Sequence, residues 1–258
     1  MSIELGKLEE WFKTNGSCGI VVAFSGGLDS TLVAAVAYRV LGKRTIAVTI
    51  SDEFITPKEG KCASKQADRI GIRHRLLELT LPKKLMDNPS DRCYRCKKLM
   101  IGKLKDFASE NGYGIVIDGT NFDDLGTDRP GLRALKEERV RSPLAELGLG
   151  KTAIRQVSRE MGLDYTKQPS PCLATRFEFG HLITKEKLQA VAEAEEFIRG
   201  LGYGQVRVRV LGDLAKIEVE SSESGKLFEN RTRGEVIERL KGLGFKHVAV
   251  DLEGYKTR

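Results

Sequence analysis

Residues near the N-terminus combine types and spacing that suit the binding of phosphate. The stretch from Ser25 to Ser30 reads Ser-Gly-Gly-Leu-Asp-Ser, follows the apolar run 18–24 and leads into a helical pattern over 28–41. Glycines let the backbone approach an anion, and the free amides of a helix N-terminus carry a partial positive charge. An ordinary strand-to-helix turn could use the same residues, so the residues alone leave a phosphate site and a plain turn as alternatives.

Three of the five cysteines could form a second chemical centre. Cys93 and Cys96 are three residues apart, a step that puts both sulfurs on one side of a helix. Cys172 stands on a proline-containing loop. Thiolates are preferred ligands of zinc and of iron–sulfur clusters. A structural zinc site needs a fourth ligand, for which His181 is the histidine nearest in sequence to Cys172. The set therefore predicts a metal or catalytic centre.

The remaining two cysteines are expected to have no chemical role. Cys18 precedes an apolar strand and Cys62 lies in a helical pattern. Unpaired cysteine behaves as a small hydrophobic residue in protein interiors. We therefore expect both side chains to be buried.

Basic residues surround the pair of Cys93 and Cys96. The chain has a net charge of +7, but the part from Arg176 to the end has 15 basic and 14 acidic residues, so the excess lies upstream. Cations lower the pKa of a nearby thiol, although a charge run can also be a solvated face. The run contains no acid and comprises Arg92, Arg95, Lys97, Lys98, Lys103 and Lys105.

Alternating strands and helices in the first half predict a doubly wound, mostly parallel α/β sheet. Ligands of such sheets collect at the carboxyl ends of the strands, where the phosphate loop lies. The expected strands are 18–24, 44–50, 73–79 and 113–117, and the expected helices are 28–41, 57–70, 96–110 and 151–161.

The second half predicts a smaller α+β domain. Two prolines interrupt the loop 168–172, beyond which come a helix at 185–199, strands at 205–210 and 215–220, a further helix and a strand at 245–252. This order suits a small antiparallel sheet backed by helices. We expect a nucleotide-binding domain over 1–168 and a substrate-binding and oligomerisation domain over 176–258.

Composition favours a soluble cytoplasmic protein. No apolar run approaches the roughly 20 residues that cross a bilayer, and the N-terminus carries acids, unlike a signal peptide. In a reducing compartment, clustered cysteines favour metal binding or catalysis over disulfides. A membrane partner is thus not expected.

The phosphate loop and its context resemble those of the PP-loop ATP pyrophosphatases. A Walker-type loop would end in Gly-Lys-Ser or Gly-Lys-Thr, which is absent. The resemblance implies an adenine nucleotide alpha hydrolase-like fold, cleavage of ATP between its α and β phosphates, an adenylated substrate and Mg²⁺. The carboxylates of Asp123 and Asp124 suit Mg²⁺, or an exposed turn. The implied ATP-binding residues are Ser25, Gly26, Gly27, Asp29, Ser30, Ser51, Gly119 and Asp124.

Several short motifs together are similar to those of the LarE family, over nearly the whole chain. The motifs are the PP-loop, 91–97, Gly119-Thr120-Asn121, Arg141-Ser142-Pro143-Leu144, 171–176 and Asp251-Leu252-Glu253-Gly254-Tyr255. LarE proteins are ATP-dependent sulfur transferases of nickel-pincer nucleotide synthesis, which convert the carboxylates of a pyridinium biscarboxylic acid mononucleotide to thiocarboxylates. The resemblance implies this small anionic nucleotide as substrate, sulfide or another sulfur donor, and a homo-oligomer such as a hexamer.

Members of that family differ in their cysteines. Some have only the cysteine matching Cys172 and sacrifice its sulfur, whereas others have three and resemble enzymes that depend on a cluster. Because Cys93, Cys96 and Cys172 are all present, the resemblance implies a 4Fe-4S cluster, with Cys172 as a cluster ligand in the catalytic centre.

The same resemblance implies that arginines bind the anionic groups of the substrate. Arg207 and Arg209 alternate with valines and project from one face of a strand. Together with Arg176 they are the expected substrate ligands, since a guanidinium fork suits phosphate and carboxylate. Glu195 and Glu196 could orient them but are expected to be surface residues.

Two other functions remain open at this point. A tRNA thiouridine synthetase would use the same chemistry, but the nearly neutral C-terminal part contains no recognisable RNA-binding module. A nucleotide-binding or zinc-stabilised module without turnover would bind ATP and release no pyrophosphate. A nucleic-acid partner is therefore disfavoured, and we expect an enzyme. An amidotransferase-type ligase would need a supply of ammonia, because no glutaminase domain is present.

Overall fold

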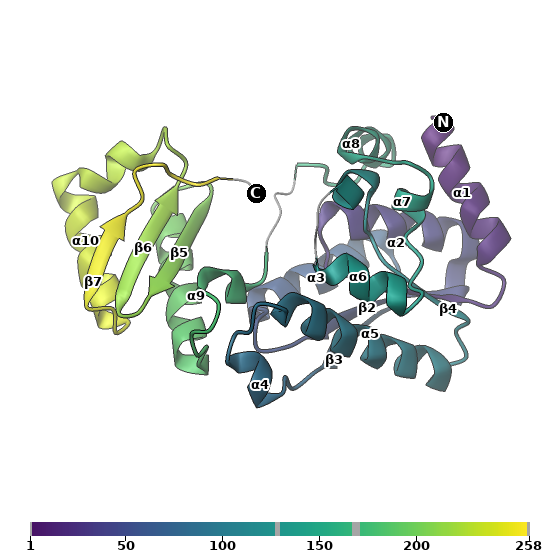
Figure 1. Cartoon of the computed structure of the whole chain (residues 1–258). Helices are drawn as coiled ribbons and strands as arrows, with labels where there is room; N and C mark the ends of the chain where they lie inside the picture. Colours follow the sequence, from purple (N-terminus) through teal and green to yellow (C-terminus); the bar gives the residue numbers. More distant parts are fainter. Residues whose placement is uncertain (1, 127–129, 167–170, 257–258) are drawn as a thin grey trace. The chain divides into compact units, whose positions relative to one another are not determined.

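The computed structural model describes residues 2–126, 130–166 and 171–256, and it forms two compact units (Figure 1). The first unit comprises Met1–Leu81 and Asp91–Ser170, and the second comprises Pro82–Ser90 and Pro171–Arg258. The predicted boundary at residue 168 and most of the predicted proline loop lie outside the described residues. No helix in the described ranges is long and apolar enough to cross a membrane.

The first unit contains a four-stranded parallel sheet, which confirms the predicted α/β class. The strands lie in the order β3-β2-β1-β4. They are β1 (Ile20–Ala23), β2 (Thr45–Ser51), β3 (His74–Glu78) and β4 (Ile115–Ile117). The α-helices of this unit are α1 (Ile3–Asn15), α2 (Leu28–Leu41), α3 (Pro57–Ile70), α5 (Arg92–Glu110), α6 (Pro130–Glu137), α7 (Pro143–Glu146) and α8 (Lys151–Glu160).

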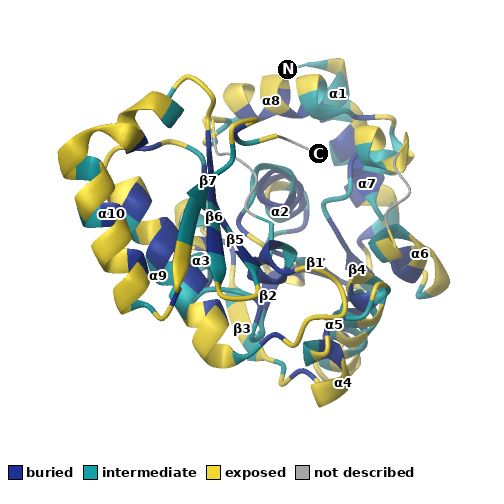
Figure 2. Ribbon diagram, turned by 60° about the vertical axis from the view of Figure 1, so that its left-hand side comes forward, coloured by how far each residue is buried: buried dark blue, intermediate teal, exposed yellow. Residues whose placement is uncertain are grey.

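Helices cover both faces of this sheet because its central strands β1 and β2 are buried on both sides. Ile20 and Val22 of β1 pack into one cluster with α1, α2, α3 and α8. Val21 points the opposite way and packs with Leu104 and Ala108 of α5. Helix α2 is buried over most of its length, and Figure 2 shows it chiefly in the colours of buried and partly buried residues.

The strand order places a topological switch between β1 and β4. From β1 the chain passes through α2 to β2 and through α3 to β3, and then returns to the other side of β1 as β4. The loops that leave β1 and β4 therefore diverge at the carboxyl edge of the sheet, which is where such folds bind ligands. The predicted phosphate loop follows β1 at this place.

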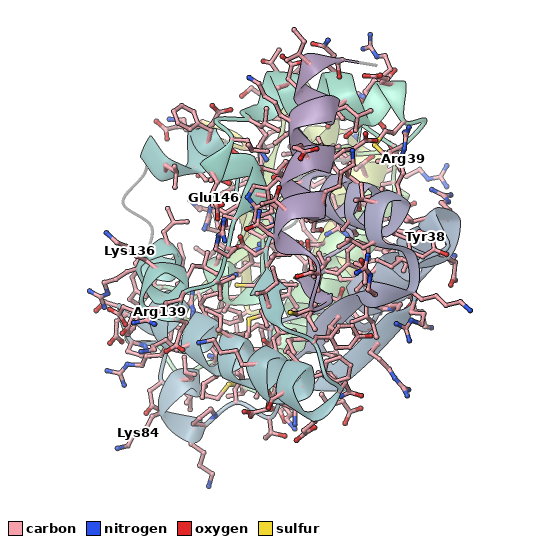
Figure 3. The ribbon with its side chains drawn as sticks, turned by 90° about the vertical axis from the view of Figure 1, so that its right-hand side faces the viewer. Tyr38, Arg39, Lys84, Lys136, Arg139 and Glu146 are labelled. Atoms are coloured by element: carbon pink, nitrogen blue, oxygen red, sulfur yellow. The ribbon has the colours of Figure 1, made fainter. Side chains whose placement is uncertain are left out.

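Helix α1 is an element that the apolar pattern alone did not predict. Ser2 caps its first turn by accepting from the Leu5 amide, and Trp11 is among its buried residues. The Trp11 indole donates to Glu146 at 2.9 Å, and Arg141 forms an ion pair with the same carboxylate. Figure 3 shows Glu146 beside α1. This contact between residues 135 positions apart ties α1 to α7 within the first unit.

The second unit has a three-stranded sheet, in the order β5-β6-β7. The prediction of an antiparallel sheet was wrong in part: β5 and β6 are antiparallel, but β6 and β7 are parallel. Helix α10 crosses over between β6 and β7, and such a crossover returns the chain in the same direction. The elements are α4 (Lys83–Met86), α9 (Lys185–Gly200), β5 (Val206–Leu211), β6 (Leu214–Val219), α10 (Asn230–Gly242) and β7 (His247–Val250).

A short segment from inside the range predicted for the first domain packs with the second unit. The carbonyl of Asn88 accepts from the Gly180 amide at 2.7 Å, and the carbonyl of Met86 accepts from the Ile183 amide at 2.8 Å. Asn88 itself is fully buried and has a φ of 56°. These two bonds tie the segment 82–90 to residues more than ninety positions later in the chain.

The expectation that Cys18 and Cys62 are buried was wrong, since both are exposed. Cys18 lies in the turn that precedes β1. On α3 the buried positions are Gly60, Ala63 and Ala67, and Cys62 falls outside this stripe. The apolar residues next to Cys18 and Cys62 in the sequence did not indicate that these two side chains point to solvent.

Candidate functional site

The predicted phosphate loop has a preformed network of hydrogen bonds. The Ser30 hydroxyl accepts from the Ser25 amide at 3.3 Å and donates to the Gly27 carbonyl at 3.2 Å. The two serine hydroxyl oxygens are 3.1 Å apart, and the Gly27 amide donates to the Ser25 hydroxyl at 3.3 Å. Gly27 is the N-cap of α2 and has no side chain with which to cap the first turn. The helix N-terminus can thus accept an anion.

Gly26 is required by its backbone conformation and by close packing. Its φ is +66°, in the left-handed region that glycine adopts without strain. A Cβ atom here would lie 2.8 Å from the Cα of Ala63 on α3. The loop therefore rests directly on a neighbouring helix, which holds its amides in place.

The loop after β4 reaches the start of α2. A Cβ at Gly119 would lie only 2.7 Å from the Ser30 amide nitrogen. The buried Asp118 carboxylate accepts from the Thr120 amide at 3.1 Å and from the Ser142 hydroxyl at 2.6 Å. These contacts bring the predicted residues Gly119, Asp29 and Ser30 together at the switch between β1 and β4.

A polar network joins Asp29 to the same loop. Asn121 donates its amide to Asp29 Oδ2 at 3.1 Å and to Asp124 Oδ2 at 2.7 Å. Lys151 Nζ lies 2.5 Å from Asp29 Oδ2. Sequence reasoning placed Lys151 at the start of a helix and gave it no role, because only the fold brings α8 to α2.

One carboxylate oxygen of Asp29 is a candidate ligand of the predicted Mg²⁺ ion. Asp29 Oδ1 is buried and has no hydrogen-bond partner among the described residues. A buried carboxylate oxygen that accepts no hydrogen bond destabilises the fold unless a cation or a water molecule binds it. Carboxylate oxygens are among the ligands that Mg²⁺ prefers. The donor atoms of Asp29 and Asp124 therefore fit such an ion.

The two other candidates at this edge differ in their surroundings. Asp123 accepts from the Lys151 amide at 2.7 Å and so stabilises the first turn of α8. Ser51 ends β2, the strand next to β1, and its carbonyl accepts from the Leu79 amide at 2.9 Å. Of the carboxylate pair, Asp124 is therefore the one linked to the phosphate loop.

The pair of Cys93 and Cys96 lies on the first turns of α5. Arg92 Nη2 is 3.9 Å from Cys93 Sγ, and Cys96 Sγ is 3.9 Å from Asp52 Oδ2. Asp52 directly follows β2, so Cys96 faces the carboxyl edge of the sheet. Burial raises the pKa of Asp52. Cys96 thus lies at the sheet edge that also holds the phosphate loop, and the exposed Cys93 lies three residues before it on α5.

Two lysines of the basic run on α5 form ion pairs with glutamates at the end of α6. Lys98 lies 3.2 Å from both Glu137 and Glu138, and Lys105 lies 2.7 Å from Glu138. The Glu138 carboxylate therefore joins two lysines of α5 to the C-terminal end of α6. These cations are neutralised inside the unit, so they add less positive charge around the thiols than the sequence suggests.

Cys172 belongs to the second unit, on a loop held by a buried ion pair. Arg176 is 5% exposed and Glu195 is 1% exposed, and the guanidinium donates two hydrogen bonds to this carboxylate, at 2.7 and 3.1 Å. Arg176 Nη1 also donates to the Pro171 carbonyl at 3.1 Å and to the Cys172 carbonyl at 3.4 Å. The expectation that Glu195 is a surface residue was wrong.

Arg207 and Arg209 lie on one face of β5, as the alternation predicts. Arg209 donates to Glu218 at 2.6 Å and to the Thr175 carbonyl at 2.8 Å, close in sequence to Cys172. Arg207 donates to the Tyr255 hydroxyl at 2.9 Å. Burial lowers the pKa of Arg207. All three predicted substrate arginines, Arg176, Arg207 and Arg209, therefore lie in the unit that contains Cys172.

The described residues do not by themselves form a metal site. Among residues 2–126, 130–166 and 171–256 there is no group of three or more His, Cys, Asp or Glu side chains that could hold a metal ion. Cys93 and Cys96 belong to the first unit and Cys172 to the second. Three cysteines have the donor chemistry of a 4Fe-4S cluster with one open iron, but each unit contributes only part of that set.

Sequence reasoning missed a partly buried chain of polar side chains behind the phosphate loop. The Thr49 hydroxyl of β2 donates to the carbonyl of Phe24, the residue before the loop, at 2.6 Å. It is also 2.8 Å from His74 Nε2, and His74 Nδ1 is 3.3 Å from the Ser64 hydroxyl. Burial lowers the pKa of His74. Polar residues within two apolar strands were the available signal.

This chain of contacts predicts an effect of Thr49 on nucleotide binding. Thr49→Val keeps the shape but leaves the buried Phe24 carbonyl without its donor, a loss of about 1–3 kcal/mol in unfolding free energy. We expect a several-fold higher KM for ATP as the loop loosens. Denaturant unfolding and pyrophosphate release measure the two effects. Thr49→Ser keeps the hydroxyl and serves as control; equal behaviour of the two variants would contradict the role.

Comparison with known proteins places these features in a family. The family model of NAD synthase matches residues 4–112, which include the phosphate loop and the cysteine pair. An uncharacterized protein of Synechocystis sp. is 44% identical over 241 residues, 92% of this chain and 90% of that protein. An uncharacterized protein of Methanocaldococcus jannaschii is 34% identical over 250 residues, 97% of this chain and 94% of that protein.

The name of a third relative states its activity. The pyridinium-3,5-bisthiocarboxylic acid mononucleotide synthase of Lactiplantibacillus plantarum is 35% identical over 242 residues. The match covers 92% of this chain and 87% of that protein. Similarity at this level extends over both units, so it is not confined to the phosphate loop.

Proposed function

This chain belongs to the LarE family, and we propose that it uses ATP to replace a carboxylate oxygen of a pyridinium biscarboxylic acid mononucleotide with sulfur. In the first step the carboxylate attacks the α phosphorus of ATP, and pyrophosphate leaves. In the second step a sulfide attacks the acyl carbon, and AMP leaves with the carboxylate oxygen. The products are a thiocarboxylate, AMP and pyrophosphate.

The observation that carries this proposal is the phosphate loop with the buried Oδ1 atom of Asp29, which has no hydrogen-bond partner in the part of the chain that the structure describes. The loop residues Ser25, Gly26, Gly27 and Ser30 surround a helix N-terminus without a side-chain cap, which suits the leaving pyrophosphate. Asp29 and Asp124 would bind Mg²⁺, which neutralises charge that develops on the phosphates. Ser51 and Gly119, at the ends of β2 and β4, would border the adenosine.

The second unit supplies cations for the anionic substrate. Arg207 and Arg209 share one face of β5, and their guanidinium forks suit phosphate and carboxylate groups. Arg176 is different, because its buried guanidinium is already engaged by Glu195 and by carbonyls of the Cys172 loop. We propose that Arg176 acts on the substrate indirectly, by holding this loop. The predicted domain 176–258 would also carry the contacts of a homo-oligomer.

We propose Cys93, Cys96 and Cys172 as the three protein ligands of a 4Fe-4S cluster. When bound, such a cluster would supply an open iron that can bind sulfide as donor. The protein's own part would be to hold three thiolates near cations such as Arg92, which is 3.9 Å from Cys93 Sγ. The alternative within the family is sacrifice of the Cys172 sulfur.

Iron and sulfide analysis of anaerobically purified protein tests the cluster proposal. We expect about four irons and four or more sulfides per chain, with the visible absorption of a cluster. Cys93→Ser should lose the iron, whereas Cys62→Ser changes an exposed cysteine outside the centre and should keep it. Iron-free protein whose Cys172 becomes lighter by the mass of hydrogen sulfide during turnover would establish the sacrificial route instead.

A further inference from the structure

We propose that Tyr255 contacts the substrate directly, as the hydroxyl donor of an anion subsite whose cation is Arg207. This inference rests on the proposed function, because it adds a specific binding residue for that substrate. Tyr255 is held in the second unit by the last described turn of the chain. Its role is argued from charge, from the direction of one hydrogen bond and from the packing of Gly254.

Arg207 is a buried cation without an acidic partner in the described residues. It is 8% exposed, and its only side-chain partner in those residues is the Tyr255 hydroxyl. Glu218 faces it across the β5–β6 pair, yet this carboxylate lies 2.6 Å from Arg209 and 3.3 Å from Lys216. Burying a charge without a counter-ion is costly. An anionic ligand would remove that cost.

The surrounding charges favour an anion. Arg176 and Arg209 both act on Arg207 as like charges, and Glu218 acts on it more weakly as an opposite charge. In the described residues, the ion pairs beside Arg207 join Arg176, Arg199, Arg209 and Lys216 to Glu195, Glu218 and Asp251, so with Arg207 the cations outnumber the acids. The excess positive charge would stabilise a bound phosphate or carboxylate.

The direction of the hydrogen bond leaves the phenol proton available. Arg207 Nη2 donates to the Tyr255 oxygen at 2.9 Å, so the phenol is the acceptor in this contact. Within the described residues the tyrosine proton has no acceptor of its own. The guanidinium carbon also lies 4.5 Å from the centre of the ring. A phenol next to a cation can thus donate its proton to the same anion oxygen that Arg207 attracts.

The backbone at Gly254 and Tyr255 is fixed against the end of β6, which holds the Tyr255 side chain beside Arg207. Gly254 has a φ of +69°, and a Cβ at this position would lie 2.7 Å from the Ser221 hydroxyl and 2.8 Å from the Val219 carbonyl. The Tyr255 amide donates to that Val219 carbonyl at 2.7 Å. The turn is therefore fixed to the end of β6, beside the strand that carries Arg207.

Removal of one hydroxyl tests the inference. Tyr255→Phe keeps the ring over Arg207, and loss of a hydrogen bond to a charged group should raise KM for the pyridinium biscarboxylic acid mononucleotide by about tenfold. KM for ATP should stay unchanged. Tyr203→Phe is the matched control, because the buried Tyr203 hydroxyl has no partner in the described residues. We expect this control to keep both KM values.

The outcomes separate the inference from the proposed function. If the wild-type protein turns over the mononucleotide and Tyr255→Phe has the same KM, the subsite is wrong and the proposed function stands. If the wild-type protein forms no thiocarboxylate from this mononucleotide, ATP and sulfide, the proposed function fails first. A fall in kcat together with a lower melting temperature, at unchanged KM, would make Tyr255 merely structural and overturn the inference.

Discussion

Gly26→Ala is expected to lower ATP-dependent pyrophosphate release by about a hundredfold or more, because misplacement by about 1 Å costs that much in a preorganised site. The new methyl group would lie 2.8 Å from the Ala63 backbone, and the chain has a φ of +66° at this position. The Ala63 backbone cannot move aside for this methyl group as a flexible side chain could. The loop must shift, and its amides would leave the phosphate position.

Gly42→Ala is the matched control for this experiment. Gly42 has a φ of +57° and would place its methyl group in open space at the end of α2. Its ψ of −127° lies outside the left-handed helical region, so alanine here carries a conformational cost of about 1–3 kcal/mol without the clash. We expect Gly42→Ala to lower the melting temperature and keep activity. Equal activity of the two variants would show that contact with Ala63 does not position the loop.

Arg176→Leu is expected to lower the unfolding free energy of the second unit by about 3–5 kcal/mol. The substitution leaves the Glu195 carboxylate, only 1% exposed, without its bidentate partner. It also frees the carbonyls of Pro171 and Cys172 from Nη1. Sulfur transfer should fall along with stability, because the Cys172 loop is no longer tied to α9. Denaturant unfolding and thiocarboxylate formation measure the two effects.

Two further variants identify the buried charge as the cause. After Arg176→Leu, the buried Glu195 carboxylate retains Arg199 at 2.8 Å and the Val208 amide at 3.0 Å but has lost its bidentate partner. Adding Glu195→Gln neutralises this carboxylate and should recover part of the lost stability. Arg239 of α10 forms an exposed ion pair, at 2.9 Å, with Glu193, which lies on α9 as Glu195 does. Arg239→Leu breaks this pair and should lower the unfolding free energy by no more than about 1 kcal/mol. If Arg176→Leu costs no more than this control, the buried pair does not stabilise the unit.

Local sequence signals predicted much of the first unit. Helix α2 begins and ends where the glycines and apolar spacing indicate, and α3 begins at Pro57 behind a Thr56 capping box. Such signals depend on neighbours within a few residues, so they survive without knowledge of the fold. The position of the phosphate loop after β1 followed from the same reasoning.

The boundaries of β strands and the directions of side chains were less predictable. The apolar run 18–24 contains a strand only from Ile20 to Ala23, and Cys18 at its start is exposed. The C-terminal sheet is mixed because α10 crosses over before β7. Pairing between strands depends on contacts between distant segments, which a local pattern does not contain.

By itself the sequence determined the α/β class, the family and the types of residue that can bind phosphate and sulfur. Tertiary structure alone decided their partners: Lys151 with Asp29, Glu195 with Arg176, and Tyr255 with Arg207. The physical reason is that the free energy of a charge depends on its burial and on the groups beside it. Those groups come from elements far apart in the chain, and only folding brings them together.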